Sequence, residues 1–230
     1  MRRFLLAVLM VVFATGSLSA QMSRSRVYTT KDPSVWLTAG IGGFRASEVN
    51  DGITSSRWNF GNSTNLQYRA SLEKGMNNGA SFGIAGSWAH VPFEYSSTAI
   101  GPIGGGVQCG SCDAHLDMTT LVATFHSGSG VGLHQVLELS GGVVAYRNLK
   151  RDSDGAKLAP SGGNIDPVFS LGWGLGYGLN DRTNIDFTSD WFTYAIHERT
   201  GVSNGASNTN NMPSLRVALR MGFGNRTARR

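Results

Sequence analysis

Two cysteines and a histidine stand close together in a glycine-rich stretch, Cys109-Gly-Ser-Cys112 with His115 after it. A redox-active Cys-x-x-Cys pair relies on a helix N-terminus to lower the thiol pKa, whereas glycine surrounds these cysteines. A structural zinc site needs four ligands, and only three are in view. Because two cysteines in an exported chain normally oxidise, we predict a local disulfide between Cys109 and Cys112. We expect no metal and no other cofactor.

His126-Ser127 places an imidazole beside a hydroxyl, the pair that hydrolases use for nucleophilic catalysis. No acidic residue that would orient the imidazole is identifiable nearby. Gly128-Ser129-Gly130 follows at once, so the favoured interpretation of His126 is a turn residue.

Charged residues also recur at alternate positions inside otherwise apolar segments. An arginine and a carboxylate make strong bidentate contacts, and an unpaired charge in a dry interior is costly. Asp186 with Arg220 and Asp190 with Arg216 fit a single antiparallel register. His115, Asp117 and His134 extend the set where the alternation is less regular. The predicted inward-facing ion-pair residues are Arg69, Glu73, Glu138, Asp186, Asp190, Arg216 and Arg220.

The segments that carry these charges alternate with a period of two. In 169–179, for example, Phe, Leu, Trp, Leu, Tyr and Leu alternate with serine and glycine. This period places the apolar side chains on one face of a strand. Each segment is about ten residues long, as a tilted membrane-spanning strand requires. Eight segments begin near Val35, Asn65, Ser81, Ala114, Leu133, Val168, Thr183 and Ser214.

The fourth segment, Ala114 to Phe125, is the least regular. Leu116 and Met118 fit one face, whereas Leu121, Ala123 and Phe125 fit the other. We therefore expect a β-bulge that shifts the register within it.

The connections between the segments alternate in length. Short links lie around 75–79, 128–130 and 180–182, and long links span about 46–63, 95–112, 148–164 and 197–212. Outer-membrane barrels have short periplasmic turns and long extracellular loops, so both termini are predicted to be periplasmic. The alternative is a secreted β-sandwich or lipocalin-like barrel, whose apolar face would point inward. The glycines of 172–178 argue against it, because their opposite face carries Trp173 and Tyr177.

Composition and the N-terminal residues agree with export. Charged residues make up 15% of the chain, against about 25% in soluble domains. Arg2 and Arg3, the apolar run 4–13 and a small-residue site at Ser19-Ala20 indicate a signal peptide over 1–20. A periplasmic extension (21–33), a barrel (34–223) and a basic tail (224–230) are predicted to follow. The net charge of +5 is not taken as a sign of a nucleic-acid partner, because an exported protein meets no nucleic acid.

The stretch Gly172-Trp-Gly-Leu-Gly-Tyr-Gly-Leu-Asn-Asp-Arg-Thr-Asn-Ile-Asp-Phe joins a glycine-rich strand, a tight polar turn and a second strand. With the alternation over 34–223, it resembles small bacterial outer-membrane β-barrel families: the OmpA transmembrane domain and OmpX-like, OmpW-like and porin-like proteins. The resemblance implies an all-β, transmembrane, antiparallel up-and-down barrel of about eight strands in the outer membrane.

An eight-stranded barrel is just wide enough inside for side chains to fill it. We therefore expect ion pairs to close the lumen and the protein to have a structural or surface-interaction role rather than an enzymatic one. The alternatives are a narrow porin-like passive channel and, less favoured, a lipid A-modifying enzyme. Expected partners are outer-membrane lipids and lipopolysaccharide, the barrel-assembly machinery, and an extracellular ligand held by the loops. Aromatic residues predicted to lie at the membrane interfaces are Trp88, Trp173, Tyr177 and Trp191.

Overall fold

The computed structural model describes residues 33–52, 54–61, 63–76, 79–98, 105–196 and 209–225. The predicted signal peptide, nearly all of the 21–33 extension and most of the basic tail lie outside these ranges. The described residues form an all-β structure, with no helix long and apolar enough to cross a membrane.

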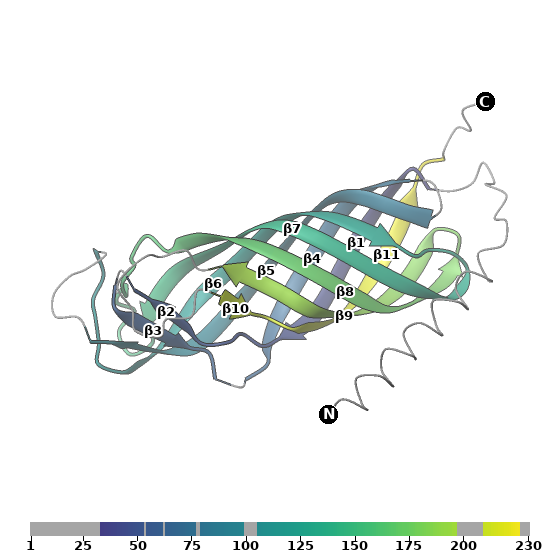
Figure 1. Ribbon diagram of the computed structural model, residues 1–230. Helices are drawn as coiled ribbons and strands as arrows, with labels where there is room; N and C mark the ends of the chain where they lie inside the picture. The colour runs from purple at the N-terminus through teal and green to yellow at the C-terminus, as the bar shows by residue number, and fades with distance from the viewer. Residues whose placement is uncertain are drawn as a thin grey trace, which may run out of the picture.

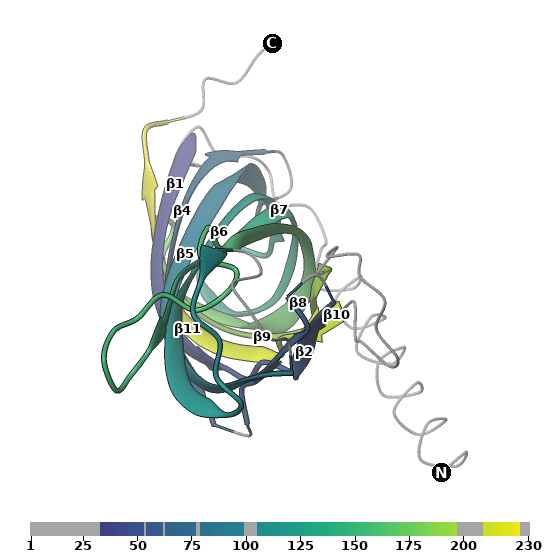
Figure 2. The ribbon, with the colours of Figure 1, turned by 90° about the vertical axis from the view of Figure 1, so that its left-hand side faces the viewer.

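Eight long strands form a closed antiparallel barrel (Figures 1 and 2). Their order around the ring is β1-β4-β5-β6-β7-β8-β9-β11, and β1 pairs with both β4 and β11 to close it. Their bounds are β1 Val35–Phe44, β4 Asn65–Gly75, β5 Ala80–Ser97, β6 Cys112–Ser127, β7 Gly132–Arg151, β8 Asn164–Asn180, β9 Thr183–Ile196 and β11 Ser214–Phe223. These correspond to the eight predicted segments.

Three short strands in the long connections were not predicted. β2 (Val49–Asp51) and β3 (Ser56–Asn59) form a hairpin, and β3 pairs with the C-terminal end of β5. β10 (Thr209–Asn211) pairs with β9. We call the end with the long connections the long-loop end, seen at the left of Figure 1. The opposite, short-turn end carries the three tight turns, the start of β1 and the end of β11.

The outward face of the barrel is apolar over a continuous belt. Large hydrophobic side chains alternate outward on every strand of the ring, and many of them are about half exposed. Such a belt is the arrangement of a membrane-spanning barrel, since lipid rather than water covers the apolar side chains. Examples are Leu37, Ile41, Leu72, Ile84, Leu121, Leu139, Phe169, Leu175, Phe187 and Val217.

The interior has two tiers of opposite character. Toward the short-turn end it is lined by charged and hydroxyl side chains, and toward the long-loop end by a buried apolar cluster. This explains the irregular fourth segment, because Leu116 and Met118 face the apolar tier while Leu121 and Phe125 face outward. The expected register shift is present between His115 and Asp117, where the paired β7 carries the extra residue and Asn148 has a positive φ of 53°. Burial alternates without a break from Ala114 to His126, so the shift does not exchange the two faces of this strand.

The register predicted for the last two strands was also wrong. Ser214 pairs with Asp190 and Ala218 with Asp186, which is two residues away from the predicted alignment. Arg216 and Arg220 therefore lie opposite Thr188 and Asn184. Hydrophobic alternation sets which face a residue occupies, and a two-residue slip preserves that face.

Candidate functional site

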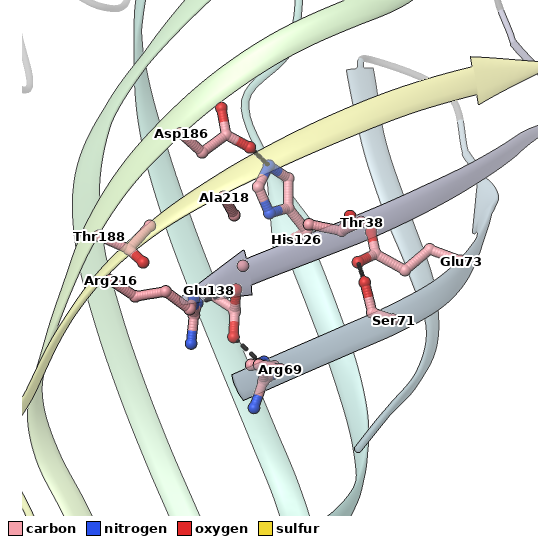
Figure 3. Close-up of a pocket in the computed structure, with 11 residues that line it drawn as sticks. Thr38, Arg69, Ser71, Glu73, His126, Glu138, Asp186, Thr188, Arg216 and Ala218 are labelled. Atoms are coloured by element: carbon pink, nitrogen blue, oxygen red, sulfur yellow. Dashed lines mark hydrogen bonds and ion pairs between the residues drawn. The ribbon is translucent and has the colours of Figure 1, made fainter. Parts of the chain in front are cut away.

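The interior of the barrel is the candidate site, and a charged bridge crosses it. Arg69 on β4 and Arg216 on β11 both donate to Glu138 on β7, with N–O distances of 2.6 and 2.7 Å (Figure 3). Arg216 also reaches Asp190 at 3.5 Å. Because β4 and β7 are three strands apart in the ring, the Arg69–Glu138–Arg216 bridge spans the lumen.

A second charged group lies nearer the short-turn end. Arg220 is fully buried and its Nη2 lies 3.0 Å from Glu73 and 2.5 Å from Ser81 Oγ. Its guanidinium stacks 4.2 Å from the centre of the Trp36 ring, an arrangement that adds cation–π attraction. The structure thus gives Arg220 the carboxylate of Glu73 as its partner rather than the predicted Asp186.

His126 belongs to this interior, whereas the sequence suggested only a turn. Its Nε2 lies 3.1 Å from the Gly128 carbonyl and 3.8 Å from Asp186, and His134 approaches the same carboxylate at 3.9 Å. The available signal was position: His126 continues the buried, even-numbered face of β6. The neighbouring Gly-Ser-Gly drew attention to the turn instead.

The glycines of β8 leave the space that these side chains occupy. A methyl group at Gly172 would collide with Asp190, and one at Gly176 would collide with His134 and Asp186. The glycine stripe therefore makes room for side chains of the neighbouring β7 and β9.

The apolar tier closes the other half of the barrel and was not predicted. Trp58, 1% exposed, comes from the β2–β3 hairpin and packs its ring 5.9 Å from Tyr146 and 6.2 Å from Phe93. Phe60 lies 5.3 Å from Phe93. Other buried members of the cluster are Phe44, Val49, Val91, Tyr95, Leu116, Met118, Val144, Leu149, Leu158, Val168 and Met212.

Two small cavities lie along the charged bridge and share Arg69 and Arg216 in their walls. The first, of about 10 Å³, is lined by polar residues that include Glu73, His126 and Asp186 (Figure 3). The second, of about 40 Å³, also has walls from the apolar tier. One water requires about 10–15 Å³, so the cavities have room for about one and about three waters.

Several predicted site residues lie outside the lumen. His115 and Asp117 point outward from β6, contrary to their proposed place in the ion-pair set. The predicted disulfide between Cys109 and Cys112 is present where β6 begins, and these two cysteines, unlike the residues just named, pack against the buried apolar cluster. The four predicted interfacial aromatics, Trp88, Trp173, Tyr177 and Trp191, all face outward. Trp173 lies between Leu171 and Leu175 of the belt rather than at its rim.

Charges in the long-loop region pair locally. Arg151 contacts Asp154 through two hydrogen bonds of 2.9 and 2.5 Å in the turn after β7. The hydrogen bond from Arg151, with one from the Ala156 amide, lowers the pKa of Asp154 to about 2. Both side chains are in solvent, so this pair orders a turn and adds little to overall stability.

Known proteins resemble this chain in fold and not in sequence. No family model and no curated protein sequence matches the chain. The chain is similar in fold to small outer-membrane β-barrels. Neisserial surface protein A is 12% identical over 83% of this chain and 97% of its own, with a TM-score of 0.48. OprG of Pseudomonas aeruginosa is 8% identical over 84% of this chain and 98% of its own, with a TM-score of 0.44. The N-terminal barrel of OprF from the same species is 16% identical over 82% of this chain and 98% of its own, with a TM-score of 0.40. Identities this low carry no information on function.

Proposed function

We propose that this protein is an outer-membrane barrel with a closed lumen and that its role is structural or one of surface interaction. The observation that carries the proposal is the double closure of the interior. The Arg69–Glu138–Arg216 bridge crosses one half, and the apolar tier around Trp58 fills the other. A solute would have to break buried ion pairs and then displace a packed aromatic cluster.

The proposed orientation places the short-turn end in the periplasm and the long-loop end outside the cell. Short turns and long loops divide between the two ends of outer-membrane barrels in this way. The described residues of the long-loop end include the β2–β3 hairpin, the disulfide and the turn at 152–155. We propose that these elements meet lipopolysaccharide or an extracellular partner, and that the barrel-assembly machinery inserts the chain.

A catalytic role is not part of the proposal. His126 is the histidine that invited a hydrolase interpretation, and it is buried in the lumen near the short-turn end. In the proposed orientation, a lipid of the outer leaflet would lie outside the barrel wall and toward the long-loop end, so it would not reach this imidazole. Lipid A should therefore keep its mass in cells that express the protein, as mass spectrometry would show.

Single-channel conductance of the refolded chain in a planar bilayer tests the closed lumen. The charged closure is weakened by Arg216→Ala with Arg220→Ala, and the apolar closure by Trp58→Ala with Phe93→Ala. We expect wild type and each double variant to be silent, because one closure remains in each. The quadruple variant should conduct.

Each outcome has a definite meaning. Steady, ion-selective steps from wild type would refute the closed lumen and favour the narrow passive channel. Conduction by the Arg216→Ala, Arg220→Ala variant alone would show that the apolar tier does not seal the barrel. Gel mobility and circular dichroism establish that each variant has folded before its conductance is interpreted.

A further inference from the structure

Two histidines lie side by side on the outer surface, immediately beyond the apolar belt toward the long-loop end. His90 is the next outward residue after Trp88 on β5, and His115 projects from the adjacent β6. The centres of their rings are 4.9 Å apart, with an angle of 41° between the ring planes. Neither residue takes part in the lumen described above.

Each imidazole is held by a carboxylate through the same nitrogen. His90 Nδ1 lies 3.0 Å from Asp117 Oδ1, and His115 Nδ1 lies 2.5 Å from Asp152 Oδ1. A carboxylate accepts, so each Nδ1 carries the proton and donates. In the neutral ring the lone pair is then on Nε2, where it is available to a ligand.

The two carboxylates are themselves fixed in place. Asn148 donates to the second oxygen of Asp117 at 2.6 Å, and the backbone amide of Asp152 donates to the Asp113 carbonyl at 3.0 Å. The turn that carries Asp152 is further held by the Arg151–Asp154 pair. The arrangement is thus built in before any ligand arrives.

We propose that His90 and His115 form a binding site for a divalent transition-metal ion such as Zn²⁺ or Cu²⁺. Histidines that bind metals almost always donate their other ring N–H to a carboxylate or carbonyl, as both rings do here. Two imidazoles on one tetrahedral ion, with Zn–N bonds of about 2.0–2.1 Å, have ring centres roughly 5 Å apart. The observed separation agrees with this geometry.

The two imidazoles favour a cation over a phosphate, because Nε2 of a neutral ring offers a lone pair and no proton. The charges around them are balanced: Asp117 and Asp152 are negative, and Arg147 and Lys150 lie directly across from Asp117 and His115 on β7. Both of these side chains oppose cation binding, so Lys150→Gln should strengthen it. Within the described residues, no group of three or more histidine, cysteine or acidic side chains is placed to hold a metal. The ion would therefore keep open positions for water or for an oxygen of a neighbouring lipid headgroup.

The test uses the full chain refolded in phosphatidylcholine vesicles, with Zn²⁺ titrated by calorimetry and Cu²⁺ followed by electron paramagnetic resonance. Wild type should bind one ion with two nitrogen ligands. His115→Gln should leave one nitrogen, and His90→Gln with His115→Gln should abolish binding. Asp152→Asn should weaken binding by about 10–100-fold while the two-nitrogen spectrum persists, as expected when an outer partner is lost.

Glu94→Gln is the matched control, because Glu94 is an outward carboxylate on β5 that contacts Ser111 and neither histidine. It should leave both affinity and spectrum unchanged. Absence of binding by wild type, or binding that survives in the double histidine variant, would overturn the proposal. These outcomes are independent of whether the lumen conducts.

Discussion

Glu138→Gln should destabilise the barrel more than any change to a surface carboxylate. Glu138 is 8% exposed and accepts from both Arg69 and Arg216. After the change, Arg216 keeps Asp190 at 3.5 Å, whereas Arg69 retains no ion-pair partner among the described residues. Two cations would remain buried with one ion pair, Arg216–Asp190, between them and the carboxylates of the bridge region.

The contacts set the size of the effect. Each close pair is worth about 4 kcal/mol gross at an effective dielectric constant of 20, and two pairs are lost. The glutamine is cheaper to bury than the carboxylate and still accepts one hydrogen bond, which offsets part of that. Breaking a buried pair while leaving its partner in place costs about 3–5 kcal/mol, and we expect a loss in free energy of unfolding within that range.

Urea titration of the chain in vesicles, followed by tryptophan fluorescence, measures this free energy if unfolding is reversible. Glu94→Gln on the outer face is the control and should change it by under about 1 kcal/mol, as exposed pairs do. An equally small change for Glu138→Gln would refute the reasoning. It would mean that bulk solvent, rather than only the water that the two cavities have room for, reaches the bridge and screens its charges, which is the behaviour of an open lumen.

Three further predictions concern other parts of the chain. Gly174→Ala should lower the free energy of unfolding by about 1–3 kcal/mol, because its methyl group would collide with the Phe187 carbonyl. Gly162→Ala is the control: its methyl group has open space, so the change should be close to neutral in the same urea assay. The Asp154 carboxyl has a folded pKa of about 2, below its usual 3.8. The stabilisation from the Arg151–Asp154 contact is therefore complete above pH 3.8 and is lost as pH falls through 2. NMR titration of the Asp154 carboxyl checks this, and a midpoint near 3.8 would contradict it. The disulfide closes a loop with a sequence separation of 3. On the loop-entropy model its reduction should lower the free energy of unfolding by at most about 2 kcal/mol. Urea midpoints measured with and without reductant check this, and a larger difference would contradict it.

The strand pattern could be predicted from the sequence because it is a local property. A period of two depends only on which face of the strand each residue occupies, and it located all eight strands of the ring. It also placed Arg69, Glu73, Glu138, Asp186, Asp190, Arg216 and Arg220 on the inner face, where the structure has them. Alternation cannot distinguish registers that differ by two residues. Arg216 still contacts the predicted Asp190, but it pairs more closely with Glu138, and Arg220 pairs with Glu73 instead of Asp186.

Only the tertiary structure decided what closes the long-loop half of the barrel. Trp58 lies in a long connection, and nothing in its neighbours shows that the β2–β3 hairpin folds back onto β5 and inserts this ring between Phe93 and Tyr146. The face that Leu116 occupies was also ambiguous, because an apolar side chain suits both a lipid-facing surface and a dry interior. Periodicity along one strand determines its two faces, whereas the character of each face at each level is set by side chains brought there from distant strands.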